Sequence, residues 1–534
     1  MAHELLFLPQ GQGSSRHMIP LHLDPAAGVT LQEQVYDQVR AAILARTLPP
    51  GAALHSTREL ARTLKVSRNT IVLAFERLAK EGYLVKRPGA GTFVCEVLPE
   101  ACVGLSESPI PEATSPAPRP PEPAVVHPPV LLRAAPLRMV QTGPSGMQVD
   151  FWYGSANSLN FPLREWRQLL LENLSRASGN LSGYGSPEGA VELRSAIARH
   201  VSANRAIQAE PDQVIITAGA QEGFNLISRL FVQPGVRIAI EDPCYAGAAH
   251  VFSSFGGALV PVPVDAHGLC TEYLAGCGAT LAYVTPSHQF PTGVTMSLGR
   301  RRELLAWARS SGAYVVEDDY DSDFRYDGAP LAALAGLDAN TSVIYLGTFS
   351  KSVGAGIRTG YMVVPKQLVR PVRQAKSLAN YGHPWLDQIV LADFIDQGRF
   401  ARHVRRIRQT YSEARQALVD SLNTHFGPAR ISGADAGMHV MWTLPDHFPP
   451  VREVARIAAD AGVGIYTLEA AGAHEIVPFR YPRAVVLGYA ALTPDAIRKG
   501  IARLATALSR AGVDLSPRFV RHRPSVLAAL GPQR

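Results

Sequence analysis

Three apolar runs that end abruptly in polar side chains constrain the fold of this chain more than any other feature. The run Val343–Leu346 leads to Lys351, the run Ala313–Val316 leads to a series of acids, and the run Val214–Ile216 leads to small residues and a helical pattern. Such runs are typical of strands buried on both faces of a parallel sheet. Because open α/β sheets bind ligands at the carboxyl ends of their strands, we expect the three polar ends to form one site.

Lys351 is the first candidate residue of that site. The chain of 534 residues contains seven lysines, and arginine supplies nearly all the remaining positive charge, so solubility alone does not explain a lysine at a strand end. An amine is a nucleophile only when it is uncharged, and partial burial lowers a lysine pKa enough to allow this. A lysine that snorkels from a strand end would be the better interpretation if Lys351 stood alone. Its position predicts capture of an aldehyde, that of pyridoxal 5'-phosphate (PLP).

The acidic residues 317–323 supply the second part of the predicted site. A carboxylate at Asp318 can hold a PLP pyridinium protonated, which keeps the ring an electron sink. We assign the contact with the ring oxygen to Tyr320. A solvated loop or a metal site would also explain an acidic cluster, but no histidine stands at ligand spacing, so we predict PLP and no metal.

A turn after the run Val214–Ile216 supplies the third part. Backbone N–H groups of Gly219, Ala220 and Gln221 can face a phosphate at a helix N-terminus, although a lone turn of this kind often serves packing. Arg358 adds a fork-shaped donor for the same phosphate. Tyr245 is placed to stack on the ring, and ordinary packing is the alternative for this aromatic residue.

Residues 30–95 differ from the rest of the chain in charge. They hold ten Arg or Lys against five Asp or Glu, an excess that makes up most of the formal net charge of +7. A concentrated basic patch is typical of binding to the phosphate backbone of nucleic acid.

The pattern of this basic segment predicts three helices and a hairpin. Apolar residues at helical spacing form a stripe on the first helix: Leu31, Val35, Val39, Ile43 and Leu44. Ser56 and Ser67 can cap a second and a third helix, and the third helix turns Val66, Ile71, Phe75 and Leu78 inward. Residues 82–94 alternate like two strands around a turn at 88–91. Together these elements predict a winged helix-turn-helix of the α+β class.

This module resembles the GntR family of DNA-binding domains. The signatures of that family correspond to His55–Ala61 and Val66–Thr70, with His55 in place of a proline. Capping and solvation of a small bundle are the alternative for any one of these polar residues, and a poor explanation for the ordered set. The resemblance implies that the following residues contact DNA: Arg58, Ser67, Arg68, Asn69, Thr70, Gly89 and Gly91.

From about residue 150 to 510 the chain resembles the fold-type I PLP enzymes, the aminotransferase superfamily. The resemblance is carried by segment 184–189, the 217–221 loop, the turn at 242–245, Asp318 with Tyr320, and Ser350-Lys351 with Arg358. It implies an α/β fold with a large and a small subdomain, Ser350 among the cofactor contacts, and a homodimer in which Tyr184 reaches the phosphate in the neighbouring subunit. Two departures weaken the case for transamination. Phe290 replaces the asparagine of an Asn-Pro-Thr-Gly motif, and Val486 replaces the arginine that holds a substrate carboxylate, with Arg480 or Arg483 as weak substitutes.

These segments predict five parts of the chain. We expect an N-terminal extension (1–28), the winged helix (29–96), a Pro-rich linker (97–147), the PLP-binding domain (148–512, with a small subdomain from about 400 to 512) and a C-terminal tail (513–534). The five cysteines show no CxxC pair, and neither a signal peptide nor a membrane span is evident. We therefore expect a cytoplasmic protein without a membrane partner.

A winged helix linked to an aminotransferase-like domain resembles the MocR subfamily of GntR regulators. The resemblance implies a bacterial transcription factor that binds promoter DNA and senses PLP, or PLP with an amine or amino acid, through a Schiff base at Lys351. It also implies a homodimer, which we expect to be domain-swapped and head-to-tail. A catalytically active aminotransferase with an appended DNA-binding domain is the alternative, since Lys351 and Asp318 are the groups that such chemistry requires. A regulator with a vestigial PLP site is a third possibility.

Overall fold

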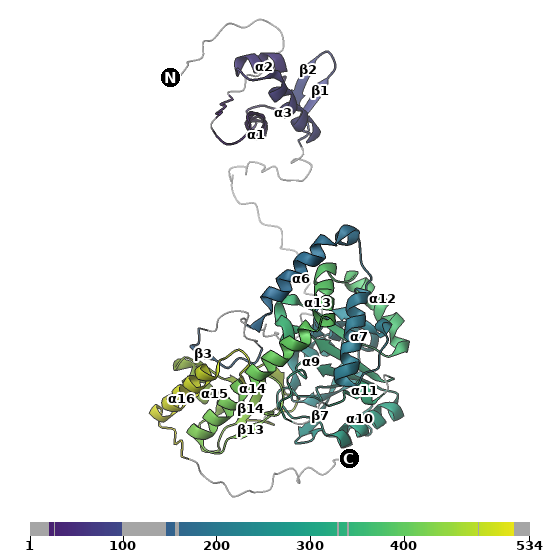
Figure 1. The fold of residues 1–534 in the computed structure, drawn as a ribbon, viewed down its shortest axis with the longest axis vertical. Coiled ribbons are helices and arrows are strands. Elements are labelled where there is room, and N and C mark those ends of the chain that lie inside the picture. The colour runs from purple at the N-terminus through teal and green to yellow at the C-terminus, as the bar shows by residue number, and fades with distance from the viewer. Residues whose placement is uncertain are drawn as a thin grey trace, which may run out of the picture. The chain divides into compact units, whose positions relative to one another are not determined.

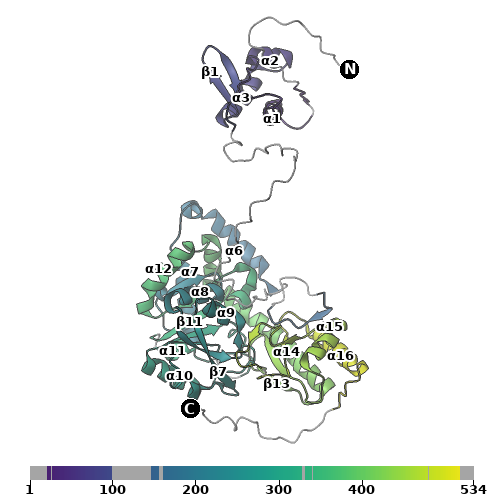
Figure 2. The same ribbon diagram turned by 180° about the vertical axis from the view of Figure 1, so that it is seen from behind.

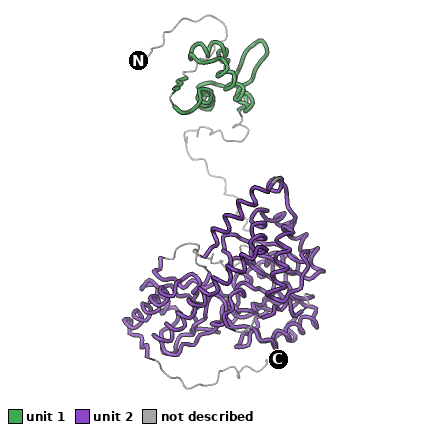
Figure 3. The backbone as a smooth tube through the Cα atoms, in the orientation of Figure 1, with its two compact units in different colours: residues 1–124 green, residues 125–534 purple. Residues whose placement is uncertain are grey.

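The computed structural model describes residues 21–25, 27–98, 146–154, 160–327, 331–338, 341–478 and 480–516. The chain divides into two compact units, residues 1–124 and residues 125–534 (Figure 3). Most of the predicted N-terminal extension, linker and C-terminal tail lies outside the described residues.

The first unit contains three helices followed by a two-stranded sheet (Figure 1). These are α1 (Leu31–Leu44), α2 (Thr57–Thr63), α3 (Arg68–Lys80), β1 (Leu84–Arg87) and β2 (Gly91–Val94), with β1 and β2 antiparallel. Thr30, Ser56 and Ser67 cap the three helices, and Ser56 forms a capping box with Glu59. The order and the caps confirm the predicted winged helix-turn-helix.

The apolar stripe of α1 packs against α3 in the core of the first unit. Val35, Val39 and Ile43 are buried there with Ile71 and Phe75. The prediction was wrong for Leu44, which is 40% exposed. As the next residue after Ile43 it lies about 100° around the helix from it, and α1 ends there before another turn can cover it.

The second unit is built on a sheet of eight strands in the order β4, β12, β11, β10, β9, β5, β7, β8. The five neighbouring strands β11, β10, β9, β5 and β7 run parallel to one another. Strand β12 is antiparallel to both of its neighbours, β4 and β11, and strand β8 is antiparallel to β7. The bounds are β4 (Val214–Thr217), β5 (Arg237–Asp242), β7 (Ala258–Asp265), β8 (Gly268–Leu269), β9 (Leu281–Val284), β10 (Tyr314–Asp319), β11 (Val343–Thr348) and β12 (Gly360–Val363).

Helices cover both faces of this sheet (Figures 1 and 2). Neighbouring strand residues point to opposite faces, so Ile216 packs in one core and Ile215 in the other. The first face carries α6 (Leu163–Ser175), α7 (Val191–Arg205), α10 (Leu298–Ser311) and α13 (Trp385–Asp396). The second carries α8 (Ala220–Phe231), α9 (Ala246–Ser254) and α12 (Val369–Asn380). This three-layer arrangement confirms the predicted α/β class.

A smaller sheet with its own core forms the small subdomain. Its strands β13 (Arg430–Ser432), β14 (His439–Thr443), β18 (Ala484–Gly488) and β16 (Tyr466–Thr467) pack around the buried Trp442, with helices α14 (Arg399–Phe426), α15 (Val451–Asp460) and α16 (Pro494–Arg510). Short elements complete the unit: α11 (Leu334–Leu337), β3 (Val149–Asp150) paired with β15 (Val463–Gly464), and β6 (Cys244–Tyr245) paired with β17 (Ala473–His474).

Helix α14 joins the two subdomains. Phe400 and Val404, near its start, are buried in a core of the large subdomain, whereas Ile407 and the later apolar residues are buried in the core of the small subdomain. A movement of one subdomain against the other therefore involves α14. No helix among the described residues is long and apolar enough to cross a bilayer.

The core of the first unit supports a stability prediction. Phe75 is 1% exposed, so Phe75→Ala removes a buried ring and should lower the free energy of unfolding of this unit by about 3–5 kcal/mol. Thermal denaturation followed by circular dichroism should show an earlier transition for this unit, while the melting of the second unit is unchanged. A shift of both transitions together would contradict separate folding of the two units.

Candidate cofactor site and DNA-binding surface

A cavity of about 230 Å³ opens where the three predicted polar strand ends meet. It is lined by nine of the ten residues predicted for the cofactor: Lys351, Asp318, Tyr320, Tyr245, Gly219, Ala220, Gln221, Ser350 and Arg358. Sequence reasoning missed Trp152, Tyr153, Gly154, Thr285, Thr348 and Ala355, which also line it. Residues 152–154 come from the start of the unit, and no pattern in the sequence connects them with strands more than sixty residues away.

The Lys351 amine lies inside this cavity. Lys351 follows β11 in a short π-helical turn, and its Nζ donates a hydrogen bond to the carbonyl oxygen of Gly154 over 3.1 Å. Burial lowers the pKa of Lys351, and the nearby carboxylates of Asp321 and Asp318 oppose this effect. A lowered pKa makes the neutral, nucleophilic amine more available, as bonding to an aldehyde requires.

Asp318 lies near the end of β10, and only one of its two carboxylate oxygens has a hydrogen-bond partner among the described residues. Its Oδ2 accepts a hydrogen bond from the Tyr283 hydroxyl at 2.9 Å, whereas the buried Oδ1 has no hydrogen-bond partner among the described residues. Burial raises the pKa of Asp318 to about 7. A protonated pyridine nitrogen would supply both a donor for Oδ1 and an opposite charge, so this residue fits a PLP ring.

One end of the cavity is formed by the start of α8 and by Arg358. Gly219 caps α8 with φ +82°, and a Cβ at Gly219 would lie 3.2 Å from Arg358 Nη2. Arg358 donates to the Ala218 carbonyl at 2.8 Å, and the hydroxyl of Thr348 donates to that of Ser350 at 3.0 Å. A guanidinium, two hydroxyls and the N-terminus of a helix together fit a phosphate.

Aromatic rings form part of the cavity wall. Tyr245 lies edge-on to Phe290 at 6.0 Å between ring centroids, and its hydroxyl accepts from Gln221 at 3.3 Å. Phe290 also contacts Tyr153 at 4.8 Å. Where the aminotransferase motif has an asparagine amide, this cavity therefore has an apolar ring that cannot donate a hydrogen bond.

Tyr320 belongs to a buried polar network behind the cavity. Its hydroxyl donates to the His288 carbonyl at 3.0 Å, and His288 Nδ1 lies 2.8 Å from Asp321 Oδ2. His288, Asp321 and His439 bring potential metal ligands within 4.8 Å of one another. Our reason for predicting no metal was incomplete, because two histidines distant in sequence reach the acidic segment through the fold. His288 Nε2 also lies 3.3 Å from the carbonyl oxygen of Gly433, which follows β13, so His288 has a role in joining the subdomains without an ion.

The remaining predicted residue, Tyr184, does not line the cavity of its own chain. It is 95% exposed, and its ring lies 6.0 Å from that of Tyr381.

No arginine enters the cavity from the positions at which a residue binding the substrate carboxylate was expected. Val486 is completely buried in β18, between Met441 and Tyr466 of the neighbouring strands. Arg483 donates to backbone carbonyls including those of Leu444 and Phe448, and Arg480 pairs with Asp242 at 3.8 Å. Neither arginine lines the cavity.

The winged helix presents the residues predicted to contact DNA. Arg58, Arg68 and Asn69 are exposed at the starts of α2 and α3. The hydroxyls of Ser67 and Thr70 are 2.8 Å apart, and the Ser67 hydroxyl accepts a hydrogen bond from the Thr70 backbone N–H, so Ser67 also caps α3.

The tip of the wing contains two glycines with positive φ, Gly89 at +75° and Gly91 at +117°. No atom lies within 4 Å of the Cβ position of either residue, so the space beside the turn is open. The backbone of this turn is therefore accessible to a groove.

Comparison with known proteins identifies both parts of the chain. The family model "Aminotransferase class I and II" matches residues 152–504, and "Bacterial regulatory proteins, gntR family" matches residues 31–94. The probable rhizopine catabolism regulatory protein MocR of Rhizobium meliloti is 34% identical over 91% of this chain and 95% of its own length. The chain belongs to the MocR subfamily of GntR regulators. The uncharacterized HTH-type transcriptional regulator YhdI of Bacillus subtilis, 35% identical over 91% of this chain and 97% of its own length, shares the full architecture of this subfamily.

Solved structures resemble the second unit of this MocR-type chain. A kynurenine aminotransferase from Pyrococcus horikoshii, in complex with PMP, matches with a TM-score of 0.63 and 29% identity over 69% of this chain and 92% of that chain. LysN, an α-aminoadipate aminotransferase from Thermus thermophilus bound to a phosphopyridoxyl-leucine, matches with a TM-score of 0.61 and 27% identity over 68% of this chain and 93% of that chain. The cofactor of this domain is pyridoxal phosphate, as predicted.

Substitution of Asp318 should weaken binding of PLP. Asp318→Asn keeps the shape but removes the charge that faces the pyridinium, and the expected loss of PLP affinity is about a hundredfold, or about 3 kcal/mol. Equilibrium dialysis with absorbance detection measures it. Tyr283→Phe removes only a hydrogen bond to the same carboxylate and should cost about tenfold. Equal PLP affinity in Asp318→Asn and the unmodified protein would contradict the assignment.

The raised pKa of Asp318 predicts a pH dependence in the PLP-free protein. Because the folded-state pKa of about 7 exceeds the unfolded value, the native state retains this proton longer, and stability is lost as pH rises from about 4 to 7. Asparagine does not titrate and therefore does not lose stability in this way. The free energy of unfolding of PLP-free Asp318→Asn, relative to that of the unmodified protein, should therefore increase by up to about 4 kcal/mol over this pH range. Urea denaturation at several pH values measures the difference, and a constant difference would contradict the assigned pKa.

Proposed function

We propose that this protein is a PLP-dependent transcriptional regulator that binds promoter DNA through its winged helix and senses PLP, or PLP with an amine or amino acid, at Lys351. One observation carries the proposal: the cavity keeps Lys351 and Asp318 but has Phe290 in place of the motif asparagine, and buried Val486 stands in place of the arginine that would hold a substrate carboxylate. Groups that hold the cofactor are retained, while groups that orient an amino acid for transamination are replaced.

The proposed sensing step begins at the Lys351 amine. PLP supplies an aldehyde that bonds covalently to amines, so an effector amine would compete with Lys351 for the same carbon. Released from that bond, the Lys351 amine is free to donate to the Gly154 carbonyl oxygen, as it does over 3.1 Å here. The sensing step therefore changes a contact between the loop after β11 and segment 152–154.

Segment 152–154 connects this change with the small subdomain. A Cβ at Gly488 in β18 would lie 2.3 Å from Tyr153 Cα, which shows how closely the two backbones approach. Phe151 N–H donates to the Gly464 carbonyl, and Gly488 N–H to that of Phe151. An effector would shift the balance between two subdomain arrangements by the difference of its affinities for them.

A homodimer is part of the proposal. Tyr184 is almost fully exposed, and further exposed apolar side chains lie on α6 and α12 and in the loops that follow them: Leu163, Leu171, Leu181, Leu378 and Tyr381. Exposed apolar surface of this extent is typical of an interface between subunits. In a head-to-tail dimer, Tyr184 would contact the phosphate in the partner's cavity, and the two winged helices would bind two half-sites of promoter DNA.

Arg68→Ala should weaken DNA binding without altering cofactor loading. Arg68 is exposed in the first turn of α3, the helix expected in the major groove, so the loss should be about 1–3 kcal/mol in binding free energy. Electrophoretic mobility shift with promoter DNA measures it, and PLP absorbance measures loading. Arg498→Ala, which removes an exposed arginine of α16, is the control and should bind DNA normally. Loss of DNA binding and PLP together in Arg68→Ala would contradict independent domains.

Lys351→Ala should separate DNA binding from sensing. The variant lacks the amine that bonds to PLP but keeps the winged helix, so non-specific DNA affinity and its steep salt dependence should remain. The change in promoter occupancy caused by PLP or an amine should disappear, as fluorescence anisotropy of labelled promoter DNA would show. An unchanged response to PLP in Lys351→Ala would contradict sensing at this residue.

Aminotransferase activity is the second candidate function. It is favoured by Lys351 and Asp318, which are the residues that transamination chemistry requires in the cavity. Sustained conversion of several amino acids with a keto acid, abolished by Lys351→Ala, would establish it and overturn a purely sensory role. Absence of turnover with PLP bound would support the sensor.

A further inference from the structure

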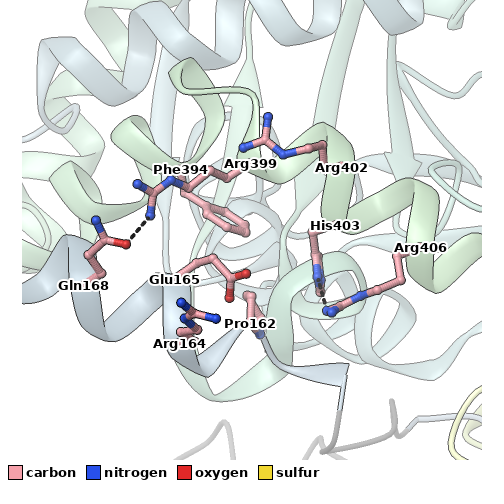
Figure 4. Close-up of a pocket in the computed structure, with 9 residues that line it drawn as sticks. All are labelled: Pro162, Arg164, Glu165, Gln168, Phe394, Arg399, Arg402, His403 and Arg406. Carbon is pink, nitrogen blue, oxygen red and sulfur yellow. Dashed lines mark hydrogen bonds between the residues drawn. The ribbon is translucent and has the colours of Figure 1, made fainter.

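A second pocket, distinct from the PLP cavity, lies at the start of α14. It has a volume of about 410 Å³ and is lined by Pro162, Arg164, Glu165, Gln168, Phe394, Arg399, Arg402, His403 and Arg406 (Figure 4). Helix α6 supplies one arginine and α14 supplies three. The size is that of small-molecule sites, which are concave and hold a few polar groups against an apolar wall.

The charge of this pocket favours an anion. Four arginines face one glutamate, and no ion pair within the described part of the chain neutralises Arg164, Arg402 or Arg406. Arg399 donates to the Gln168 side chain at 3.2 Å, which is a neutral partner. Guanidinium groups bind phosphate through two parallel hydrogen bonds, so several of them around one hollow match an organic phosphate.

The position of the arginines on α14 is a second reason to expect a bound anion. The N-terminus of a helix carries partial positive charge, and cations in its first turns are unfavourable there. Helix α14 has no acid in its first turn and places Arg399, Arg402 and Arg406 in its first eight residues. A bound anion would offset this repulsion and would be stabilised by the helix itself.

The floor of the pocket connects with the PLP cavity. Buried His403 has Nε2 2.7 Å from the carbonyl oxygen of Ser352, the residue after Lys351, so Nε2 carries the proton and donates it. His403 Nδ1 then accepts from Arg406 Nη2 at 3.2 Å (Figure 4). Burial lowers the pKa of His403, which favours this neutral form. A chain of two hydrogen bonds thus runs from a rim arginine to the backbone that holds Lys351.

We infer that this pocket, formed by Arg164, Arg399, Arg402 and Arg406, binds a small organic phosphate, and that Arg406 and His403 transmit its binding to the Lys351 segment. The apolar wall of Pro162 and Phe394 suits the carbon part of such a ligand, and the depth of the pocket down to buried His403 distinguishes it from a flat surface for the DNA backbone. The binding step is independent of the proposed function. The transmission step rests on the presence of PLP at Lys351.

Pyrophosphate is the probe for the binding step, applied to the full-length, PLP-loaded protein so that the phosphate place of the cofactor cavity is filled. Isothermal titration calorimetry should show saturable binding, and Arg402→Ala/Arg406→Ala should weaken it at least tenfold. The matched control is Arg452→Ala/Arg456→Ala, which has the same spacing on α15 but removes arginines paired with Glu469, Glu453 and Asp460. The control should bind as the unmodified protein does. No saturable binding, or equal losses in both variants, would overturn the binding site.

Duplex DNA provides the other arm of the test. If Arg402→Ala/Arg406→Ala lowers affinity for a non-specific duplex while pyrophosphate does not bind, the pocket is a DNA contact and the inference is wrong. Normal DNA binding by the variant, with weakened pyrophosphate binding, supports it. Unchanged promoter binding in Arg68→Ala, by contrast, would count against the proposed function and would say nothing about this pocket.

The transmission step has a spectroscopic test. Saturating pyrophosphate should change the absorbance spectrum of PLP bound at Lys351. His403→Phe keeps a ring in the buried position but has no hydrogen-bonding nitrogen, so it should bind pyrophosphate within a few fold of the unmodified affinity and lose the spectral change. A spectral change that persists in His403→Phe would overturn transmission through this residue.

Discussion

The site depends on burial of opposite charges at the carboxyl edge of one sheet. Asp318 lies near the end of β10 and Lys351 lies in the turn after the adjacent parallel strand β11, so the pairing of these strands brings both residues to the same edge of the sheet. Burial raises the pKa of Asp318 and lowers that of Lys351, so both groups are less charged than they would be in water. A cofactor with a basic ring nitrogen and an aldehyde relieves both costs at once, which explains why this cavity suits PLP.

Contacts around Asp318 and Lys351 connect the cavity with the boundary between the large and the small subdomain. Lys351 contacts segment 152–154, which packs on β18 of the small subdomain, and α14 spans the cores of both subdomains. In the proposed mechanism two inputs would converge on one segment: the bond at Lys351 and the hydrogen-bonded chain through His403 to Ser352. Phe290 contacts Tyr153 of segment 152–154, whereas Val486 is buried in β18 and does not line the cavity.

Much of the fold and site could be predicted because the relevant signals are local. The caps Ser56 and Ser67 mark helix starts within a few residues, and the apolar runs before Asp318 and Lys351 mark buried strands. Signals that depend on the fold were missed. His288 and His439 meet only across the subdomain boundary, Tyr153 reaches the cavity from the start of the unit, and Leu44 is exposed because α1 ends there. The residues next to His288, His439 and Tyr153 in the sequence do not indicate these contacts.

Borohydride reduction of the PLP-loaded protein, followed by peptide mass spectrometry, tests the central claim most directly. Reduction makes the bond between the cofactor and its lysine permanent and thereby reports which amine holds it. The account predicts a phosphopyridoxyl group on the peptide that contains Lys351 and on no other of the seven lysines. An unlabelled Lys351 peptide, or a label on a different lysine, would contradict the account.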